Sequence, residues 1–174
     1  EDYRDIESIN AYKEYTENNI MNPEEMMSAL KAISRDNART PMQWDDSENA
    51  GFTTGTPWIK VNPNYRMINA KSALEDKDSV FYYYQKLIKL RKENEIIIDG
   101  VFKGLLEEDE NIYAYERVLG EQKLLVACNF SDKTVDCDLF EAEEVKTGQE
   151  LISNYVYHTE GVLKPYEARV VLIS

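Results

Sequence analysis

The pattern of hydrophobic and polar residues divides the chain into a helical first part and a β-rich second part. Between Asp5 and Tyr15, the apolar residues Ile6, Ile9 and Tyr12 recur every three positions, which is the spacing of one helix face. Later in the chain the period changes from that of a helix to that of a strand. The first part therefore predicts helices, and the second predicts an antiparallel β-domain.

A second helix is predicted over residues 23–33, and a third over residues 79–94. Asn22 can accept a hydrogen bond from the free N–H groups at the start of the second helix. Pro23 suits the first helical position, and Glu25 completes a capping box. The third helix carries one predicted apolar face, formed by Val80, Phe81, Tyr84, Leu87, Ile88 and Arg91.

Residues 34–70, between these two helices, show no lasting period. They hold three of the five prolines and are rich in Asn, Asp and Thr, which predicts a long irregular loop. Loops of this length in a compact chain are usually functional or disordered, and Trp44 and Trp58 argue against disorder. We expect Trp44 to anchor packing rather than to stack on a sugar ring.

From residue 95 onward the period is two, which predicts short strands joined by tight turns. The predicted strands are 96–98, 100–106, 112–119, 123–130, 134–140, 150–153 and 168–173. Cys128 and Cys137 would lie on neighbouring strands of one hairpin, as small buried residues rather than as a redox pair. His158 lies between two predicted strands, and we expect it on the surface.

Composition and charge narrow the classes of function. Lys and Arg total 20 against 33 Asp and Glu, and the net charge of -13 should repel a phosphate backbone, which excludes a nucleic-acid partner. No apolar run approaches the ~18 residues that cross a bilayer, so no membrane role is predicted. One histidine and two cysteines do not make a zinc cluster, and we predict neither metal nor cofactor. The lack of a disulfide framework favours a cytoplasmic location.

One segment of the loop makes the sequence recognisable. Residues 34–45, SRDNARTPMQWD, resemble the signature of the oligo-1,6-glucosidase, dextran glucosidase and trehalose-6-phosphate hydrolase group of the α-amylase superfamily. Other segments are similar to the same group, namely EDYRDIES at 1–8, AGFT at 50–53, VNPNY at 61–65 and LKPYEA at 163–168. The resemblance implies an α+β chain: the last helical segments of a TIM barrel, followed by a C-terminal antiparallel β-sandwich.

The resemblance also implies the domain organisation and the activity. Residues 1–94 would be the C-terminal tail of the catalytic barrel, with the last βα loop and the final helices, and residues 95–174 the C-terminal β-domain. The parent protein would be a retaining α-glucosidase that hydrolyses α-1,6 or related bonds of short oligosaccharides with two carboxylates. Those carboxylates would precede Glu1. No catalytic residue is assigned here, and the chain, expected to be a fragment, is predicted to be inactive by itself. Its oligomeric state is not predicted.

The resemblance implies three substrate-binding residues: Arg35, Arg39 and Glu7. A guanidinium offers a rigid fork of five donors, which suits sugar hydroxyls or a neighbouring carboxylate. Arg35 is the favoured sugar contact, Arg39 is the second candidate, and the arginine that does not touch sugar would brace the loop. Glu7 would line the adjoining subsite. The alternative for both arginines is an exposed ion pair worth under ~1 kcal/mol.

A different class of function also fits the pattern. The β-domain could be a stand-alone carbohydrate-binding or structural accessory domain. Tyr113 and Tyr115 share one face of a predicted strand, which suits a sugar platform, although core packing explains the pair equally well.

Overall fold

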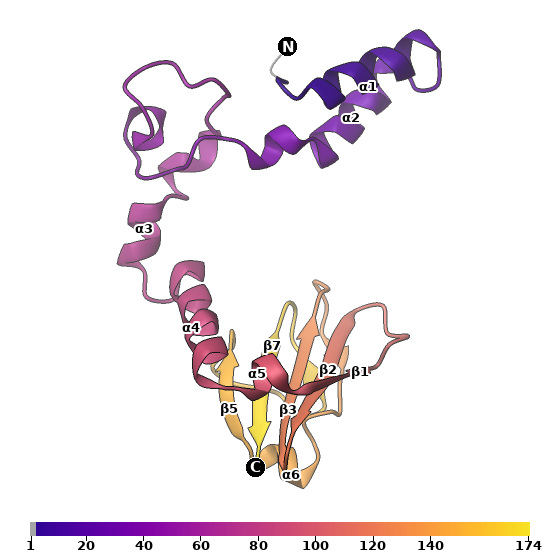
Figure 1. Cartoon of the computed structure of the whole chain (residues 1–174), viewed down its shortest axis with the longest axis vertical. Coiled ribbons are helices and arrows are strands. Elements are labelled where there is room, and N and C mark those ends of the chain that lie inside the picture. Colours follow the sequence, from indigo (N-terminus) through magenta and orange to yellow (C-terminus); the bar gives the residue numbers. More distant parts are fainter. Residues whose placement is uncertain (1–2) are drawn as a thin grey trace. The chain divides into compact units, whose positions relative to one another are not determined.

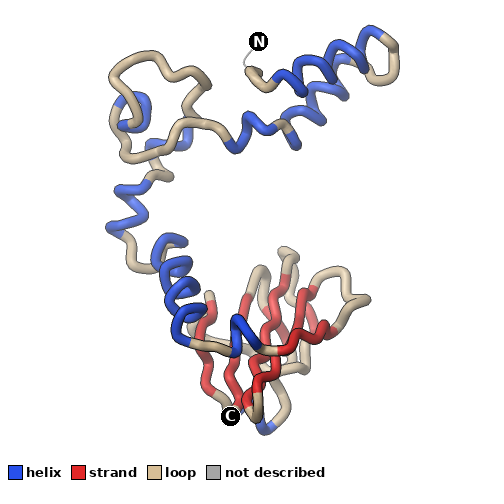
Figure 2. The backbone as a smooth tube through the Cα atoms, in the orientation of Figure 1, coloured by secondary structure: helices blue, strands red, loops and turns tan. Residues whose placement is uncertain are grey.

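The computed structural model describes residues 3–174. The chain divides between Ser79 and Val80 into two compact units, each with its own elements (Figure 1). Within the described residues, all strands lie in the second unit, from residue 101 onward (Figure 2). No helix of this part of the chain is both long and apolar enough to cross a membrane.

The first unit is built of helices and irregular loops. Its helices are α1 (Ile6–Glu17), α2 (Pro23–Ile33) and α3 (Ala70–Glu75), with short 3-10 turns η1 (Arg35–Ala38), η2 (Glu48–Gly51) and η3 (Pro63–Arg66). The two helices predicted in this unit are confirmed. The start of α2 also follows the prediction, because the Asn22 side chain accepts from the Glu25 N–H at 2.9 Å while the Glu25 carboxylate accepts from the Asn22 N–H at 3.3 Å.

The predicted irregular loop over residues 34–70 is confirmed, and it is held by local hydrogen bonds. Asn49, Ala50 and Gly51 all have positive φ, and a Cβ on Gly51 would lie 2.8 Å from an Asp45 carboxylate oxygen. The carbonyl of the buried Ala50 accepts from the N–H groups of Trp44 and Asp45, which closes this turn. The loop is therefore ordered by local hydrogen bonds, with Ala50 and Ile59 buried in it.

The second unit is an antiparallel sheet covered on both faces. Its helices are α4 (Val80–Glu93), α5 (Ile96–Asp99) and α6 (Glu143–Lys146). Its strands are β1 (Val101–Leu105), β2 (Ile112–Leu119), β3 (Gln122–Asn129), β4 (Val135–Asp136), β5 (Gln149–Ser153), β6 (Val162–Leu163) and β7 (Ala168–Ile173). The large sheet has the order β1-β2-β3-β7-β5, and β4 pairs with β6 in a small second sheet.

Each face of β3 contributes to a separate hydrophobic core. Leu124 and Val126 pack with Ile96 of α5 on one face. Leu125 and Ala127 pack on the other face with a cluster that includes Leu163 of the small sheet. Because both faces are covered, Leu124–Ala127 form a continuous buried run instead of an alternation.

Two predicted strands are wrong in the structure. Residues 96–98 form α5, because Ile96 is buried in the sheet core and this packing outweighs the strand preference of three consecutive isoleucines. Of residues 134–140, only Val135 and Asp136 form a strand, and this strand pairs with β6 rather than with β3.

The predicted cysteine hairpin is also wrong. Cys128 lies on β3, whose neighbours are β2 and β7, and its side chain packs with the core under α5. Cys137 follows β4 and is buried in the core on the opposite face. Both thiols are free, and burial raises the pKa of each. The two cysteines therefore act as separate packing residues.

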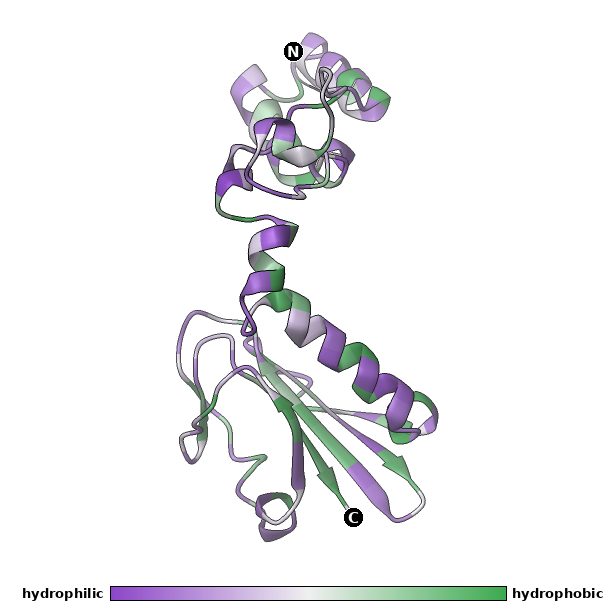
Figure 3. Cartoon of the chain, turned by 90° about the vertical axis from the view of Figure 1, so that its left-hand side faces the viewer, coloured by the Kyte–Doolittle hydropathy of each residue, from purple (hydrophilic) through white to green (hydrophobic). Residues whose placement is uncertain are grey.

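The third predicted helix is confirmed as α4, but the hydrophobic residues of its predicted apolar face are exposed. Leu90, on another side of the helix, packs with the core, whereas Val80, Tyr84 and Ile88 are exposed. Figure 3 shows hydrophobic residues along the strands, whereas α4 alternates between hydrophobic and hydrophilic residues. This helix is therefore apolar on more than one side.

Candidate functional site

A cluster of charged side chains gathers where α1 begins and α2 ends. The Arg35 guanidinium donates to Asp5 Oδ1 at 2.7 Å, and its Nη2 lies 3.2 Å from Glu7 Oε2. Asp5 is the N-cap of α1, and Arg35 opens η1 directly after α2. The Asp5 side chain is only 4% exposed, whereas the Arg35 side chain is 49% exposed. One side of the guanidinium is thus fixed by carboxylate, and the other side remains accessible.

Asp36, in the first turn of η1, and Arg39, the C-cap of η1, support this cluster. Asp36 Oδ2 accepts from the backbone N–H groups of Arg4 at 2.6 Å and Asp5 at 2.8 Å, which ties the chain before α1 to η1. Arg39 Nη1 lies 3.6 Å from Asp36 Oδ1 and 3.9 Å from Asp5 Oδ1. Arg39 is therefore positioned as a brace between the two buried carboxylates.

Two serines complete the polar core of the site. The Ser8 hydroxyl donates to Asp5 Oδ2 at 2.9 Å and lies 2.8 Å from the Ser34 hydroxyl. Ser34 caps η1 by accepting from the Asp36 N–H. Asp5 is therefore held by Ser8 of α1 and Arg35 of η1, which together fix the orientation of its carboxylate.

The site opens onto a cavity of about 310 Å³ between α1 and α2. Asp5, Glu7 and Arg35 supply charged groups to its lining, and Met26 and Leu30 of α2 supply apolar ones. A half-exposed guanidinium next to two carboxylates, in the lining of a partly apolar cavity, can bind a neutral polyol through several directed hydrogen bonds.

The acidity of Asp5 gives a testable property of this site. The hydrogen bond from Arg35 is the main reason that the pKa of Asp5 falls to about 2, and the Ser8 bonds lower the pKa further. In the unfolded chain an Asp titrates near ~3.9, so its contribution to stability is complete above about pH 4 and is lost as the pH falls towards 2. We expect the Asp5 carboxyl ¹³C shift to titrate with a midpoint near 2. The Asp5→Asn variant should lose this part of the acid sensitivity, and a midpoint of ~3.9 would contradict the ion pair.

The structure brings together the three residues predicted to bind substrate, Arg35, Arg39 and Glu7. It also adds Asp5 and Asp36, which the sequence analysis did not select. The N-cap pattern of Asp5, three residues before Ser8, could have indicated a buried role for Asp5. No local pattern marks the role of Asp36 in holding the chain before α1, because the backbone N–H groups that it accepts from lie 31 and 32 residues away.

Trp44 does not anchor packing as predicted. Its side chain is 54% exposed, and only its backbone N–H is tied to the turn, by donating to the Ala50 carbonyl. Among residues 3–174, no three His, Cys, Asp or Glu side chains are close enough to hold a metal ion.

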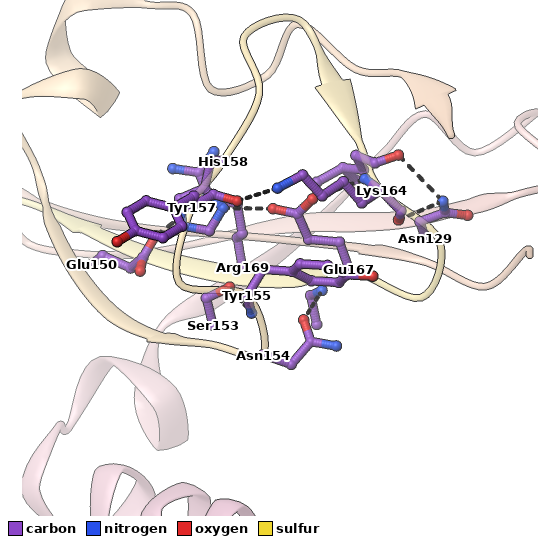
Figure 4. A network of polar contacts seen from close by, with 12 residues as sticks. Asn129, Glu150, Ser153, Asn154, Tyr155, Tyr157, His158, Lys164, Glu167 and Arg169 are labelled. Atoms are coloured by element: carbon purple, nitrogen blue, oxygen red, sulfur yellow. Dashed lines mark hydrogen bonds and ion pairs between the residues drawn. The ribbon is translucent and has the colours of Figure 1, made fainter. Parts of the chain in front are cut away.

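The second unit contains a different polar network, around a fully buried carboxylate (Figure 4). Glu167 accepts from the Lys164 N–H at 2.8 Å and lies 2.5 Å from His158 Nδ1. The other nitrogen of His158 lies 2.9 Å from Glu150, which also binds Arg169. His158 was expected on the surface, and this is wrong: Glu150 of β5 and Glu167, directly before β7, lie against its side chain, which is only 20% exposed.

This second network ties down the loop between β5 and β7. Besides His158, the Asn154 side chain donates to the Tyr166 carbonyl at 2.8 Å and accepts from the Ala168 N–H at 2.8 Å. All these partners are protein groups, and the carboxylate at the centre is inaccessible. The network therefore stabilises the conformation of this segment, and it does not have the properties of a binding site.

Two family models together match nearly the whole chain. The α-amylase catalytic domain matches residues 4–100, and the maltogenic amylase C-terminal domain matches residues 102–170. The charged cluster lies within the first of these matches. The chain belongs to the α-amylase family. The helices within residues 4–100 are the closing part of a TIM-barrel catalytic domain, and the antiparallel sheets are the β-domain that follows.

Relatives of this α-amylase family chain match along its whole length. The oligo-1,6-glucosidase of Parageobacillus thermoglucosidasius is 55% identical over 99% of the chain, and the trehalose-6-phosphate hydrolase of Bacillus subtilis is 44% identical over 99%. The crystal structure of Bacillus licheniformis trehalose-6-phosphate hydrolase matches with a TM-score of 0.89, at 45% identity over 99% of the chain. The chain spans about a third of each protein, between 31% and 32%. Because catalytic-domain relatives match the whole chain, a stand-alone carbohydrate-binding or accessory domain is not favoured.

Proposed function

We propose that this chain is the C-terminal part of a retaining α-glucosidase that hydrolyses α-1,6 or related glucosidic bonds of short oligosaccharides. The 55% identity with an oligo-1,6-glucosidase over nearly the entire chain carries this proposal. In this proposal, residues 1–94 belong to the catalytic domain and residues 95–174 form the C-terminal domain. The two free cysteines support a cytoplasmic location as part of the same proposal.

The charged cluster would contribute substrate binding rather than bond cleavage. Arg35 would donate to sugar hydroxyls from its exposed side while Asp5 fixes its other side. Glu7, whose carboxylate is exposed, would accept from a hydroxyl of the adjoining sugar. Arg39 would hold Asp36 and Asp5 in place. The nucleophile and the general acid that a retaining hydrolase needs would come from the two thirds of the enzyme that this chain does not span.

Turnover by the chain and by a chimeric enzyme tests this proposal. The chimera carries this chain in place of the matching third of the P. thermoglucosidasius oligo-1,6-glucosidase. We expect no hydrolysis of isomaltose, an α-1,6-linked glucose disaccharide, by the chain alone, because two positioned carboxylates are required. We expect the chimera to hydrolyse isomaltose with retention of anomeric configuration.

The unmodified relative serves as the positive control in this assay. A chimera that folds but does not hydrolyse α-glucosides would contradict the proposed activity. Measurable turnover by the 174-residue chain alone would contradict the assignment of both catalytic carboxylates to the rest of the enzyme.

A further inference from the structure

The His158 ring lies between two carboxylates that come from different parts of the β-domain (Figure 4). Its Nδ1 is 2.5 Å from Glu167 Oε1, and its Nε2 is 2.9 Å from Glu150 Oε2. A neutral imidazole has one N–H donor and one nitrogen lone pair, whereas an ionised carboxylate only accepts hydrogen bonds. A neutral ring would therefore satisfy one contact and turn its lone pair towards a carboxylate oxygen at the other. Both contacts are favourable when both nitrogens carry a proton.

Two further groups bind these carboxylates from other elements. Glu167 Oε2 accepts from the Lys164 N–H at 2.8 Å, in the loop after β6. Glu150 Oε2 lies 3.3 Å from Arg169 Nε on β7. When the ring carries both protons, the two positive and two negative charged side chains of this network cancel. When the ring is neutral, one negative charge is left without a partner beside the fully buried Glu167.

The ring holds a segment that has little packing of its own. Residues 154–161, between β5 and β6, form no helix or strand, and none of them is buried. Val156 and Tyr157, directly before the histidine, are 85% and 81% exposed. The Lys164 ammonium donates to the Tyr157 carbonyl, so it faces this segment rather than the carboxylates. Polar contacts therefore fix the segment, and those of His158 join it both to β5 and to the residue before β7.

We propose that His158 is a pH-sensitive clamp on residues 154–161. The doubly protonated ring joins Glu150 to Glu167 and holds the segment closed, and release of one ring proton to solvent weakens this connection. The clamp is complete at mildly acidic pH, where a histidine carries both protons in folded and unfolded chains alike, and it weakens as the pH rises. This inference concerns the β-domain alone and does not depend on the proposed substrate.

Nitrogen NMR of the histidine ring tests the protonation state. The chain has one histidine, so no other imidazole overlaps with its two ring nitrogens. We expect both nitrogens of His158 to show imidazolium shifts at about pH 7.5 in the folded chain. The same chain unfolded in urea should show the shifts of a mainly neutral ring at that pH, because an unfolded histidine titrates near ~6.5. A neutral ring in the folded chain would overturn the clamp.

Hydrogen exchange at the β3 amides of residues 124–127 tests whether this proton stabilises the β-domain. The protection factor compares each exchange rate with that of an unstructured peptide at the same pH, which removes the intrinsic effect of pH. We expect protection to fall by about tenfold between about pH 6 and pH 8, because the folded chain binds a proton that the unfolded chain releases. Histidine is the side-chain type that ordinarily titrates in this range, and the chain has a single one.

The variant Glu150→Gln separates a clamp from a contact that is merely structural. The glutamine amide can donate to a neutral Nε2 while Nδ1–H donates to Glu167, so both contacts survive without the second ring proton. We expect protection in this variant to change by no more than about twofold over the same pH range. Glu143→Gln, at an exposed carboxylate of α6, makes the same change of charge and should keep the tenfold decrease of the parent. Equal pH dependence in Glu150→Gln and the parent would overturn the proposal.

Discussion

Replacing Arg35 by alanine is expected to lower kcat/KM of the chimera for isomaltose by about 100-fold. The guanidinium is half exposed and held in one orientation by Asp5 and Glu7, so its free N–H groups are aimed before substrate arrives. Loss of charge-assisted hydrogen bonds to sugar hydroxyls reduces transition-state binding. Arg35→Lys should recover little of the loss, because an ammonium cannot make the bidentate contacts of the planar fork.

A matched set of variants separates sugar binding from neutralisation of Asp5. Arg39→Ala removes a cation that is 3.9 Å from Asp5 instead of 2.7 Å, and it should cost about tenfold or less. If Arg35 served only to neutralise Asp5, the double variant Asp5→Ala, Arg35→Ala would regain activity over Arg35→Ala. We expect no such recovery. An Arg35→Ala chimera with unchanged kcat/KM would show that the cluster only braces the loop.

Elements with local signals could be predicted from the sequence, and elements decided by distant packing could not. Asn22, Pro23 and Glu25 define the start of α2 within four residues, so the capping box was predictable in detail. Ile96 has the side chain of a strand residue, but the core under β3 places it in a helical turn. β4 pairs with β6, and the paired residues Asp136 and Val162 are 26 positions apart. No short turn joins the two strands, so the local sequence does not predict this pairing.

The residues of the candidate site also divide into those that the sequence predicts and those that depend on distant packing. Arg35, Arg39 and Glu7 were predicted because they stand in segments that resemble a family. The ion pair between Arg35 and Asp5, and the hydrogen bond from the Asp5 N–H to Asp36, join positions about 30 residues apart and depend on how α1 and η1 pack. His158 was misplaced for the same reason, since it is partly covered by Glu150 of β5 and by Glu167 directly before β7, and not by its sequence neighbours.

The largest expected effect on stability lies in the second unit, at Glu167. Its carboxylate is fully buried and satisfied by His158 and by the Lys164 N–H, at 2.5 Å and 2.8 Å. Glu167→Ala would leave both donors without this acceptor and open a cavity beside β7. Removing one partner of a buried pair costs several kcal/mol, so we expect the unit to lose about 3 kcal/mol of unfolding free energy.

Hydrogen exchange at the β3 amides of Leu124–Ala127 measures this loss, because these amides lie in the centre of the sheet and exchange only when the unit unfolds. Exchange in Glu167→Ala should be about 100-fold faster than in the parent. Glu167→Gln should cost less, because an amide oxygen still accepts from the Lys164 N–H. Glu143→Ala, at an exposed carboxylate of α6, is the control and should change stability by no more than about 0.5 kcal/mol. Equal exchange rates in Glu167→Ala and this control would show that the buried carboxylate does not lock the loop between β5 and β7.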